Sequence, residues 1–218
     1  MATSGETAWS LNAAQLVEEA LSENAILPIG EQPTAPELAK CLIRLNAMLK
    51  TWQMQGLGWK QETITQAIGA GEASVALPTY VREVNGARFV ESSAYERQMQ
   101  RFERDEYTRL PNKTSTGKST AFYVERGTSG LTLHVWPVPA ANSNLKLDID
   151  RKLDTVTAAA QTVDFPEELQ EAVYANLAVR CAGIFGVQPK EELYLRAARL
   201  EREMLDTYRP ASYFLEAL

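Results

Sequence analysis

Apolar residues recur at helical spacing near both ends of the chain, whereas the middle alternates between apolar and polar residues. Ser10 is a plausible N-cap for a first helix, and Thr34 with Glu37 is a capping-box pair that opens a second helix. The second helix should end near Gly56, and it carries one apolar stripe: Leu38, Leu42, Leu45, Leu49 and Trp52. This pattern predicts a helical hairpin over residues 1–58.

The helical periodicity returns after residue 160. Asp164 and Glu167 form another capping-box pair, and Gly186 suits the position just past a helix end. The apolar positions between them are Leu169, Val173, Leu177, Cys181 and Ile184. Pro189 then opens a last helix, whose inward positions are Leu193, Ala197, Leu200 and Met204. Residues 161–208 are therefore predicted to form a second helical hairpin.

Residues 59–160 are predicted to form a β-rich insertion. Residues 62–68 and 73–77 are short β-prone runs separated by a glycine-rich turn, which predicts a hairpin. Three later runs alternate between apolar and polar residues and are joined by turn-rich linkers, so they predict a three-stranded meander with one solvated face. These runs are residues 120–126, 131–137 and 145–153.

Two further signals lie inside the insertion. Asn85-Gly86 is the dipeptide most typical of a two-residue hairpin turn, because a type I′ turn needs positive φ at both central positions. Residues 93–107 are rich in charged residues and are predicted to form a short polar helix. The predicted fold class is therefore α+β: a four-helix core made of two helical hairpins, with an inserted, mostly antiparallel β region.

The composition is that of a globular protein with an acidic balance. The 218 residues carry a formal net charge of −6, which argues against a surface that grips DNA through clustered Lys and Arg. DNA could still pass along such a protein without being held. No apolar run is long enough to span a bilayer, and Cys41 and Cys181 are expected to be buried. With a single histidine no zinc site is expected, and no cofactor is predicted.

The segment NKTSTGKS, residues 112–119, partly matches a phosphate-binding loop. Gly117, Lys118 and Ser119 fit the second half of that motif, but Asn112 replaces its first glycine. The segment also leads into a predicted strand, whereas a phosphate-binding loop opens a helix. A solvated loop is the better interpretation, and nucleotide binding is not expected.

Catalysis by carboxylates or by histidine has weak support. Adjacent carboxylates occur at Glu18-Glu19, Glu167-Glu168 and Glu191-Glu192. They lie in first turns or on outward faces of predicted helices, where acidic side chains complement the helix dipole. His134 is the only base available for a Ser/His/Asp triad, and the alternation around it places it on the polar face of a strand. No enzyme activity is predicted.

The C-terminal segment 209–218 adds aromatic and apolar residues after the last helix. A terminus of this kind favours docking on a partner over packing against the chain's own core. The candidate docking residues are Arg209, Pro210, Tyr213, Phe214, Leu215 and Leu218.

Several segments, in this order and spacing, resemble the head-to-tail adaptor family of short-tailed phages, whose members are also called tail accessory factors or packaged-DNA stabilisation proteins. The resemblance covers nearly the whole chain. It rests on AAQLVEEALSENAIL followed by GEQPTAPELAKCLIRLNAMLKTWQMQGLGW, on ETITQAIGAGEASVALP, on FYVERGTSGLTLHVWPVPAANSNLKLDIDR, and on DFPEELQEAVYANLAVRCAGIFG. The stretch between residues 82 and 111 matches least well.

The resemblance implies a structural protein of the virion neck, made in the host cytoplasm. Family members form a ring, usually dodecameric, below the portal; the ring extends the DNA channel, helps retain packaged DNA and receives the tail. The expected partners are the portal protein, tail or nozzle proteins and further copies of the chain, with DNA passing through without sequence-specific binding. Segment 209–218 would dock on the portal, and the β region would face the tail.

A ring subunit needs two complementary side surfaces, because a cyclic assembly uses head-to-tail contacts. The polar faces of the last two predicted helices offer candidates for these contacts: Glu171, Arg180, Arg196, Arg199 and Glu203. Two alternatives remain at this point. The chain could be a hydrolytic enzyme that uses surface carboxylates, or a generic oligomeric binding module with a helical core.

Overall fold

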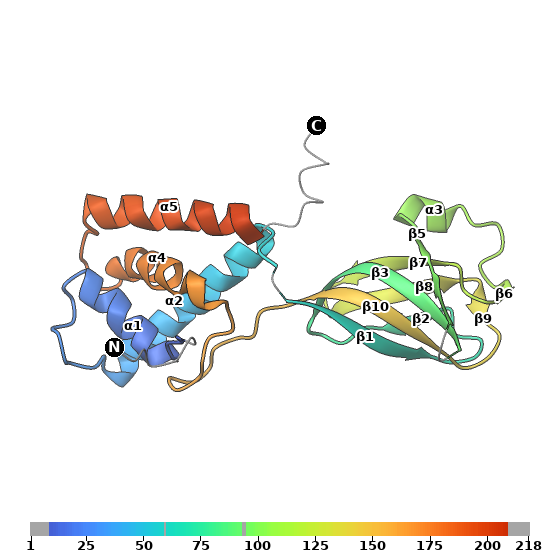
Figure 1. Cartoon of the computed structure of the whole chain (residues 1–218), viewed down its shortest axis with the longest axis horizontal. Coiled ribbons are helices and arrows are strands. Elements are labelled where there is room, and N and C mark those ends of the chain that lie inside the picture. The colour runs from blue at the N-terminus through green and yellow to red at the C-terminus, as the bar shows by residue number, and fades with distance from the viewer. Residues whose placement is uncertain (1–8, 59, 93–94, 209–218) are drawn as a thin grey trace, which may run out of the picture. The chain divides into compact units, whose positions relative to one another are not determined.

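A computed structural model describes residues 9–58, 60–92 and 95–208 of the chain. The chain divides into two compact units (Figure 1). The helical unit comprises Met1–Trp59 and Leu153–Leu218, and the β unit comprises Lys60–Lys152. Each unit has its own buried apolar cluster. Among the described residues, none of the helices is long and apolar enough to cross a membrane.

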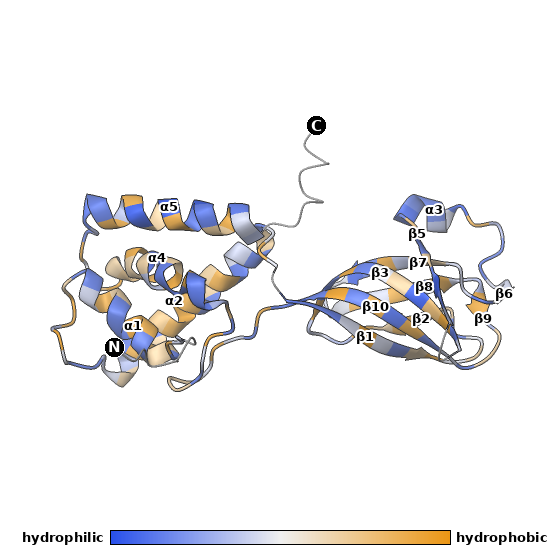
Figure 2. Ribbon diagram, in the orientation of Figure 1, coloured by the Kyte–Doolittle hydropathy of each residue, from blue (hydrophilic) through white to orange (hydrophobic). Residues whose placement is uncertain are grey.

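The helical unit is organised around one central helix. Its described elements are α1 (Ala13–Glu23), α2 (Ala35–Met54), the 3-10 turn η1 (Glu167–Leu169), α4 (Gln170–Ala182) and α5 (Glu191–Tyr208). Because α4 packs against α1, α2 and α5, it is buried on most of its circumference, and Figure 2 shows it as more apolar than α5. The expected arrangement as two helical hairpins is not confirmed, since α1 packs mainly on α4 rather than on α2.

Most residues of the apolar stripes predicted for the helices are buried. These are Leu45, Leu49 and Trp52 of α2, Leu169, Val173, Leu177 and Cys181 before and within α4, and Leu193, Ala197 and Met204 of α5. The remaining stripe residues are only partly buried: Leu38, Leu42, Ile184 and Leu200. The capping box of Thr34 and Glu37 is present at the start of α2.

The first helix begins later than Ser10. Its N-cap is Asn12, whose side chain accepts from the Gln15 N–H, while the Gln15 side chain accepts from the Asn12 N–H. The next two N–H groups, those of Ala13 and Ala14, donate to carbonyls of residues 161 and 159. The start of α1 is therefore marked by a local capping box, which sequence analysis passed over in favour of Ser10, and it is also held by a distant segment.

The predicted capping box at Asp164 is wrong. The chain is extended through Pro166, η1 begins at Glu167, and α4 begins only at Gln170. Pro166 explains the difference, because a residue that precedes proline is driven out of the helical region, and Phe165 would have been the first helical residue. At the other end Gly186 has positive φ, as expected past a helix end, but α4 itself ends at Ala182.

The segment between the β unit and η1 has little regular structure and is held by side chains of α2. Asn46 Nδ2 donates to the Val156 carbonyl at 2.8 Å, and its Oδ1 accepts from the Val156 N–H at 2.9 Å. Lys50 Nζ donates to the Leu153 carbonyl. These bonds supply partners that an extended backbone would otherwise lack when it is buried against a helix.

The β unit contains two four-stranded sheets and a small two-stranded one. The first has the order β1-β10-β3-β4 and the second β2-β8-β7-β5, while β6 pairs with β9. All pairs are antiparallel except β5 with β7 and β6 with β9. The strands are β1 (Gln61–Ile68), β2 (Ser74–Ala76), β3 (Val81–Ser92), β4 (Tyr95–Gln98), β5 (Gln100–Arg101), β6 (Thr116–Gly117), β7 (Ala121–Gly127), β8 (Gly130–Trp136), β9 (Val138–Pro139) and β10 (Ser143–Arg151).

Two predicted strand pairings are wrong. The runs at 62–68 and 73–77 do not form a hairpin, because β1 pairs with β10 over eight residues whereas β2 pairs with β8 in the other sheet. The predicted meander is only partly present: β7 and β8 form its hairpin, but the run at 145–153 becomes β10, between β1 and β3. Alternation identified the strands correctly, but it carries no information on which distant strand is the partner.

Asn85-Gly86 is a bulge within the single strand β3, not a hairpin turn. Gly86 pairs with Asp148 and Val84 with the next residue, Ile149, so Asn85 is the extra residue. Asn85 Nδ2 donates to Asp150 Oδ1 at 2.8 Å. The bulge keeps Val84 and Ala87, which are both fully buried, in the same core, and this burial favours a continuous strand over a turn.

The predicted polar helix at 93–107 is also largely wrong. The described part of this stretch forms β4, β5 and then the short helix α3 (Arg104–Thr108). The charged side chains find partners across strands instead of along a helix: Glu96 pairs with Arg88 of β3 and with Lys146 of β10. Met99, between β4 and β5, is buried in the core of the β unit.

Candidate interaction surfaces

The predicted interface residues Glu171 and Arg196 lie close together on the helical unit, beside Glu23 of α1. Arg196 forms an ion pair with Glu23, and its Nε lies 4.0 Å from Glu171 Oε1. The hydrogen bond with Glu23 raises the pKa of the Arg196 guanidinium. Burial raises the pKa of the nearby Tyr174 hydroxyl. Arg196 thus holds α5 to α1 within one chain, a role that sequence analysis missed.

The other three candidates are placed differently. Arg199 and Glu203 are exposed on α5 and face one another one helical turn apart, with Nε and Oε1 separated by 3.8 Å. Arg180 of α4 is half-buried, so it is less accessible than sequence analysis expected. The predicted docking residues from Arg209 to Leu218 lie outside the described residues.

A second set of exposed side chains on the helical unit was missed. On α2, Ile43 is 68% exposed and Met54 is 81% exposed. On α5, Tyr194 is 59% exposed and Leu195 is 60% exposed. The sequence did contain a signal, because α2 has a second row of apolar residues opposite its buried stripe. The buried stripe alone was enough to predict the helix, so the second row was not considered.

Polar side chains inside the helical unit fix these helices relative to one another. Trp52 of α2 is fully buried, and its Nε1 donates to Glu201 Oε1 of α5 at 2.6 Å. Asn176 of α4 donates to the Ala197 carbonyl of α5 at 3.0 Å. The outer faces of α2 and α5 are therefore carried on a framework with specified registers, as a surface that binds a partner requires.

Cys41 and Cys181 are both buried, as predicted, and lie on α2 and α4. The Cys41 thiol interacts with the Cys181 thiol, and that hydrogen bond together with burial raises the pKa of Cys181. A buried thiol with a raised pKa is a poor nucleophile, because the thiolate is the reactive form. Among the described residues, no cluster of His, Cys, Asp or Glu could hold a metal ion.

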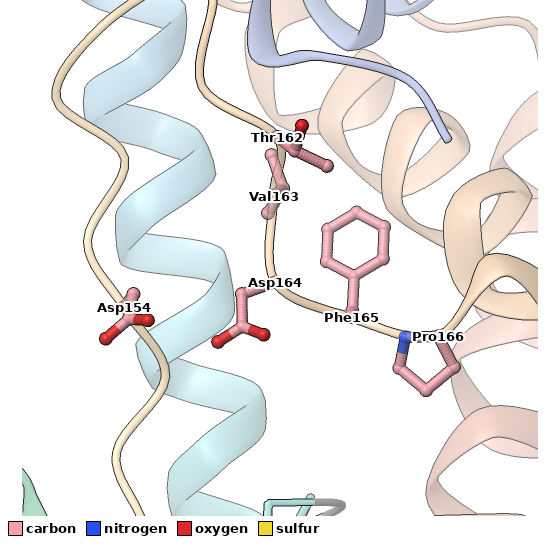
Figure 3. Close-up of a pocket in the computed structure, with 6 residues that line it drawn as sticks. All are labelled: Asp154, Thr162, Val163, Asp164, Phe165 and Pro166. Carbon is pink, nitrogen blue, oxygen red and sulfur yellow. The ribbon is translucent and has the colours of Figure 1, made fainter. Parts of the chain in front are cut away.

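One open depression of about 470 Å³ lies beside the segment that leads into η1 (Figure 3). Figure 3 shows the carboxylates of Asp154 and Asp164 on two neighbouring extended segments, with Phe165 and Pro166 beyond them. The six glutamates weighed above as catalytic pairs do not line this depression. The depression therefore gives no support to hydrolysis by those carboxylate pairs.

The phosphate-loop resemblance and the lone histidine both have structural explanations. Lys118 Nζ donates to Glu91 Oε2 at 2.8 Å, and this contact lowers the pKa of the Glu91 carboxyl. The segment leads into strand β7, as predicted. His134 Nε2 lies 2.9 Å from Glu125 Oε2, and its ring stacks with that of Tyr123. His134 is therefore part of a packed ring cluster.

Charge is divided unevenly between the two units. The helical unit contains 17 acidic and 9 basic residues, whereas the β unit contains 11 acidic and 13 basic residues. The formal net charges are therefore −8 and +2, which together give the −6 of the whole chain. The acidic balance belongs to the helical unit alone.

Comparison with known proteins gives a family. The model of the SU10 adaptor protein family matches residues 12–213. No curated protein matches the chain significantly. A chain of a solved structure described as the neck of an empty GTA particle, computed with C6 symmetry, is 13% identical, with coverage of 80% of this chain and 81% of that chain. Its TM-score of 0.32 is too low to establish a shared fold.

The family match confirms the resemblance to phage adaptors that the sequence motifs indicated, and it extends over both units. It points to a structural rather than an enzymatic role. The chain belongs to the SU10 adaptor protein family.

Proposed function

We propose that copies of this protein form a ring, a dodecamer in the virion, between the portal and the tail. The ring extends the DNA channel, helps retain the packaged DNA and receives the tail. The observation that carries this proposal is the adaptor family match over residues 12–213, which spans both units. The chain is made in the host cytoplasm and joins the virion neck during assembly.

Ring formation needs two different side surfaces on each subunit. Arg199 and Glu203 are exposed and available for contacts with a neighbouring copy, and Glu171 is also exposed. Arg196 contributes indirectly, because its ion pair with Glu23 fixes α5 against α1 within the subunit. Arg180 is a weaker candidate because it is half-buried.

Segment 209–218 docks on the portal in this proposal. The anchors are Tyr213, Phe214, Leu215 and Leu218, with Arg209 and Pro210 at the start of the segment. One short segment binds weakly, but the ring's symmetry multiplies its contacts. The β unit contacts the tail or nozzle proteins.

The charge distribution supports a channel that does not hold DNA. The helical unit carries a formal charge of −8, and a surface with that balance repels phosphates instead of neutralising them. DNA then slides past the ring without sequence-specific binding. Retention of packaged DNA would follow from the ring closing and narrowing the channel, not from affinity for DNA.

Co-purification with the portal protein of the same phage tests the proposal. The full chain should form a complex whose mass corresponds to several adaptor copies per portal ring. A chain ending at Ser212 should have an unchanged circular dichroism spectrum but bind the portal at least about 100-fold more weakly, since it lacks the aromatic anchors. A Glu216→Gln chain is the matched control and should bind normally. Normal binding by the shortened chain would exclude segment 209–218 as the docking element, and no binding by the full chain would exclude the adaptor ring.

A further inference from the structure

Two helix faces of the helical unit are exposed, apolar and opposite in charge. The face of α2 consists of Ala39, Lys40, Ile43, Arg44, Ala47 and Met54, all of them exposed. The face of α5 consists of Glu191, Glu192, Tyr194, Leu195 and Ala198, which are also exposed. Below, these sets are called the α2 face and the α5 face.

The α2 face follows one side of the helix, with the half-buried Lys50 between Ala47 and Met54. Residues 39, 43 and 47 succeed each other at a spacing of four, and residue 54 falls on the same side two turns later. The stripe from Ala39 to Met54 is about 22 Å long at about 1.5 Å per residue. Lys40 and Arg44 border it on one side, and the only acidic residue of α2, Glu37, is engaged in the helix cap.

The first turn of α5 has the complementary charge, although the exposed Arg202 lies further along the same side of the helix. Tyr194, Leu195 and Ala198 are three, four and seven positions after Glu191, so they share its side of the helix, and Glu192 lies next to that side. Acidic residues in a first turn complement the helix dipole, which alone would account for their presence. That explanation does not account for two large apolar side chains that are each about 60% exposed beside them.

The charged groups of both faces lack partners within the described part of the chain. Lys40 and Arg44 appear in no ion pair there, and neither do Glu191 and Glu192. By contrast, Arg196 and Arg199 on the same α5 are paired with Glu23 and Glu203. The two faces that expose the large apolar residues therefore also carry charges that are available to a partner.

We infer that the α2 face of one copy binds the α5 face of the next copy in the ring. Two different faces of one chain that complement each other allow head-to-tail contact, whereas a face that complements itself would give a closed dimer. Opposite charges at the border of an apolar contact fix its register and its partner. The inference rests on the proposed ring and identifies its side surfaces, with a second copy of this chain as the occupant.

Cross-linking tests the contact in the assembled state. An Ile43→Cys chain is mixed with a Leu195→Cys chain and treated with a short bismaleimide. The reaction is carried out once at high protein concentration without the portal ring and once in its presence. The mixed pair should give a cross-linked dimer at least about 10-fold above that of an Ile43→Cys and Glu19→Cys mixture, since Glu19 is exposed on α1 and belongs to neither face. One chain with both substitutions should give a ladder of oligomers.

Charge reversal provides the second measurement. Lys40→Glu with Arg44→Glu, or Glu191→Lys with Glu192→Lys, should each weaken self-association about 10-fold, and the two pairs combined should restore it, because opposite charges face each other again. Circular dichroism confirms that each variant folds. If rings assemble but the mixed cross-link does not form, or if the combined charge reversal does not restore self-association, the contact between the α2 and α5 faces is wrong while the proposed ring still stands. If mass measurement finds no oligomer either alone or on the portal, the ring itself is wrong and this contact with it.

Discussion

Replacement of Asn46 by alanine should destabilise the helical unit more than any change at an ordinary half-exposed helix position. Asn46 is the side chain of α2 that both donates to and accepts from the backbone of Val156, at 2.8 and 2.9 Å. It also donates to the Leu42 carbonyl of its own helix at 3.0 Å. Removal of the amide therefore leaves the backbone of a buried residue with an unpaired donor and an unpaired acceptor.

The magnitude follows from those two groups. A neutral hydrogen bond contributes about 1 kcal/mol to stability, and a buried group left without a partner costs about 1–3 kcal/mol. Two such bonds give a loss of about 3 kcal/mol. Alanine returns about 0.6 kcal/mol because it is a better helix former than asparagine. We therefore expect Asn46→Ala to lower the free energy of unfolding by about 2–2.5 kcal/mol.

Urea unfolding followed by far-ultraviolet circular dichroism measures this loss, since the long helices all belong to the helical unit. The midpoint should fall by about 1 M urea. Hydrogen exchange at the Val156 amide should accelerate, because its acceptor is gone. The control is Thr51→Ala, whose hydroxyl bonds only to the Ala47 carbonyl of the same helix, and its effect should stay within about 0.5 kcal/mol. Equal effects of the two variants would refute the role given to Asn46.

Three further changes have defined outcomes. Trp52→Phe keeps a ring in the core but removes the donor to Glu201, so calorimetry should show a loss of about 1–2 kcal/mol, more than for Glu201→Gln, which retains an acceptor. Hydrogen bonds from Thr34 lower the pKa of the Glu37 carboxyl in the folded chain. The charged carboxylate therefore stabilises the folded chain at pH values above the unfolded-state pKa, and this stabilisation is lost as the pH falls through the folded-state pKa. Thr34→Ala should return the pKa of Glu37 toward its usual value in an NMR titration. Lys118→Ala should leave calorimetric titrations with ATP flat, like the unaltered chain, and saturable binding by the unaltered chain would contradict the assignment of a solvated loop.

The helices could be predicted from the sequence because their signals are local. The cap at Thr34 and Glu37 and the buried stripe through Leu45 and Trp52 each depend on residues less than two turns apart. The start of α1 was placed two residues early although Asn12 and Gln15 form a local capping box; its bonds to carbonyls about 145 residues away add a support that the sequence could not show. The start of α4 was misplaced for a local reason, the effect of Pro166 on the residue before it.

The β unit was predicted less well, because the pairing of its strands depends on residues far apart in the sequence. Most of the longer strands were recognised by alternation, although β4 and β5 were mistaken for a helix, and every pairing that joins distant strands was missed, since β1 and β3 both find their partner in β10. Asn85-Gly86 carries a strong turn signal that burial of Val84 and Ala87 overrides. The local preference for a turn contributes about 1 kcal/mol. Loss of burial costs about 1.5–3 kcal/mol for a large apolar side chain, so the burial of the two core residues outweighs the turn preference.

The interaction surfaces were the hardest to predict. Sequence analysis selected charged residues on α4 and α5, and of these Arg196 proved to be used within the chain. It passed over Ile43 and Leu195 because each lies in a helix whose apolar residues already had an explanation in the core. Whether an apolar residue packs in the core or is available to a partner depends on its exposure. Exposure in turn depends on which side of the helix packs against α4.

The division of charge between the units bears on how such a ring could treat DNA. Many acidic side chains of the β unit are matched by basic ones across strands, as Glu91 is by Lys118 and Asp148 by Arg88. The helical unit has eight more acidic than basic residues, so most of its excess cannot be paired within the chain. At physiological salt a charge acts over about 8 Å, so this excess affects DNA only where helices line the channel itself. If neutralising that excess by Glu→Gln substitutions on one helix slows DNA exit, that helix faces the channel, and the same substitutions on an outward-facing helix should leave the rate unchanged.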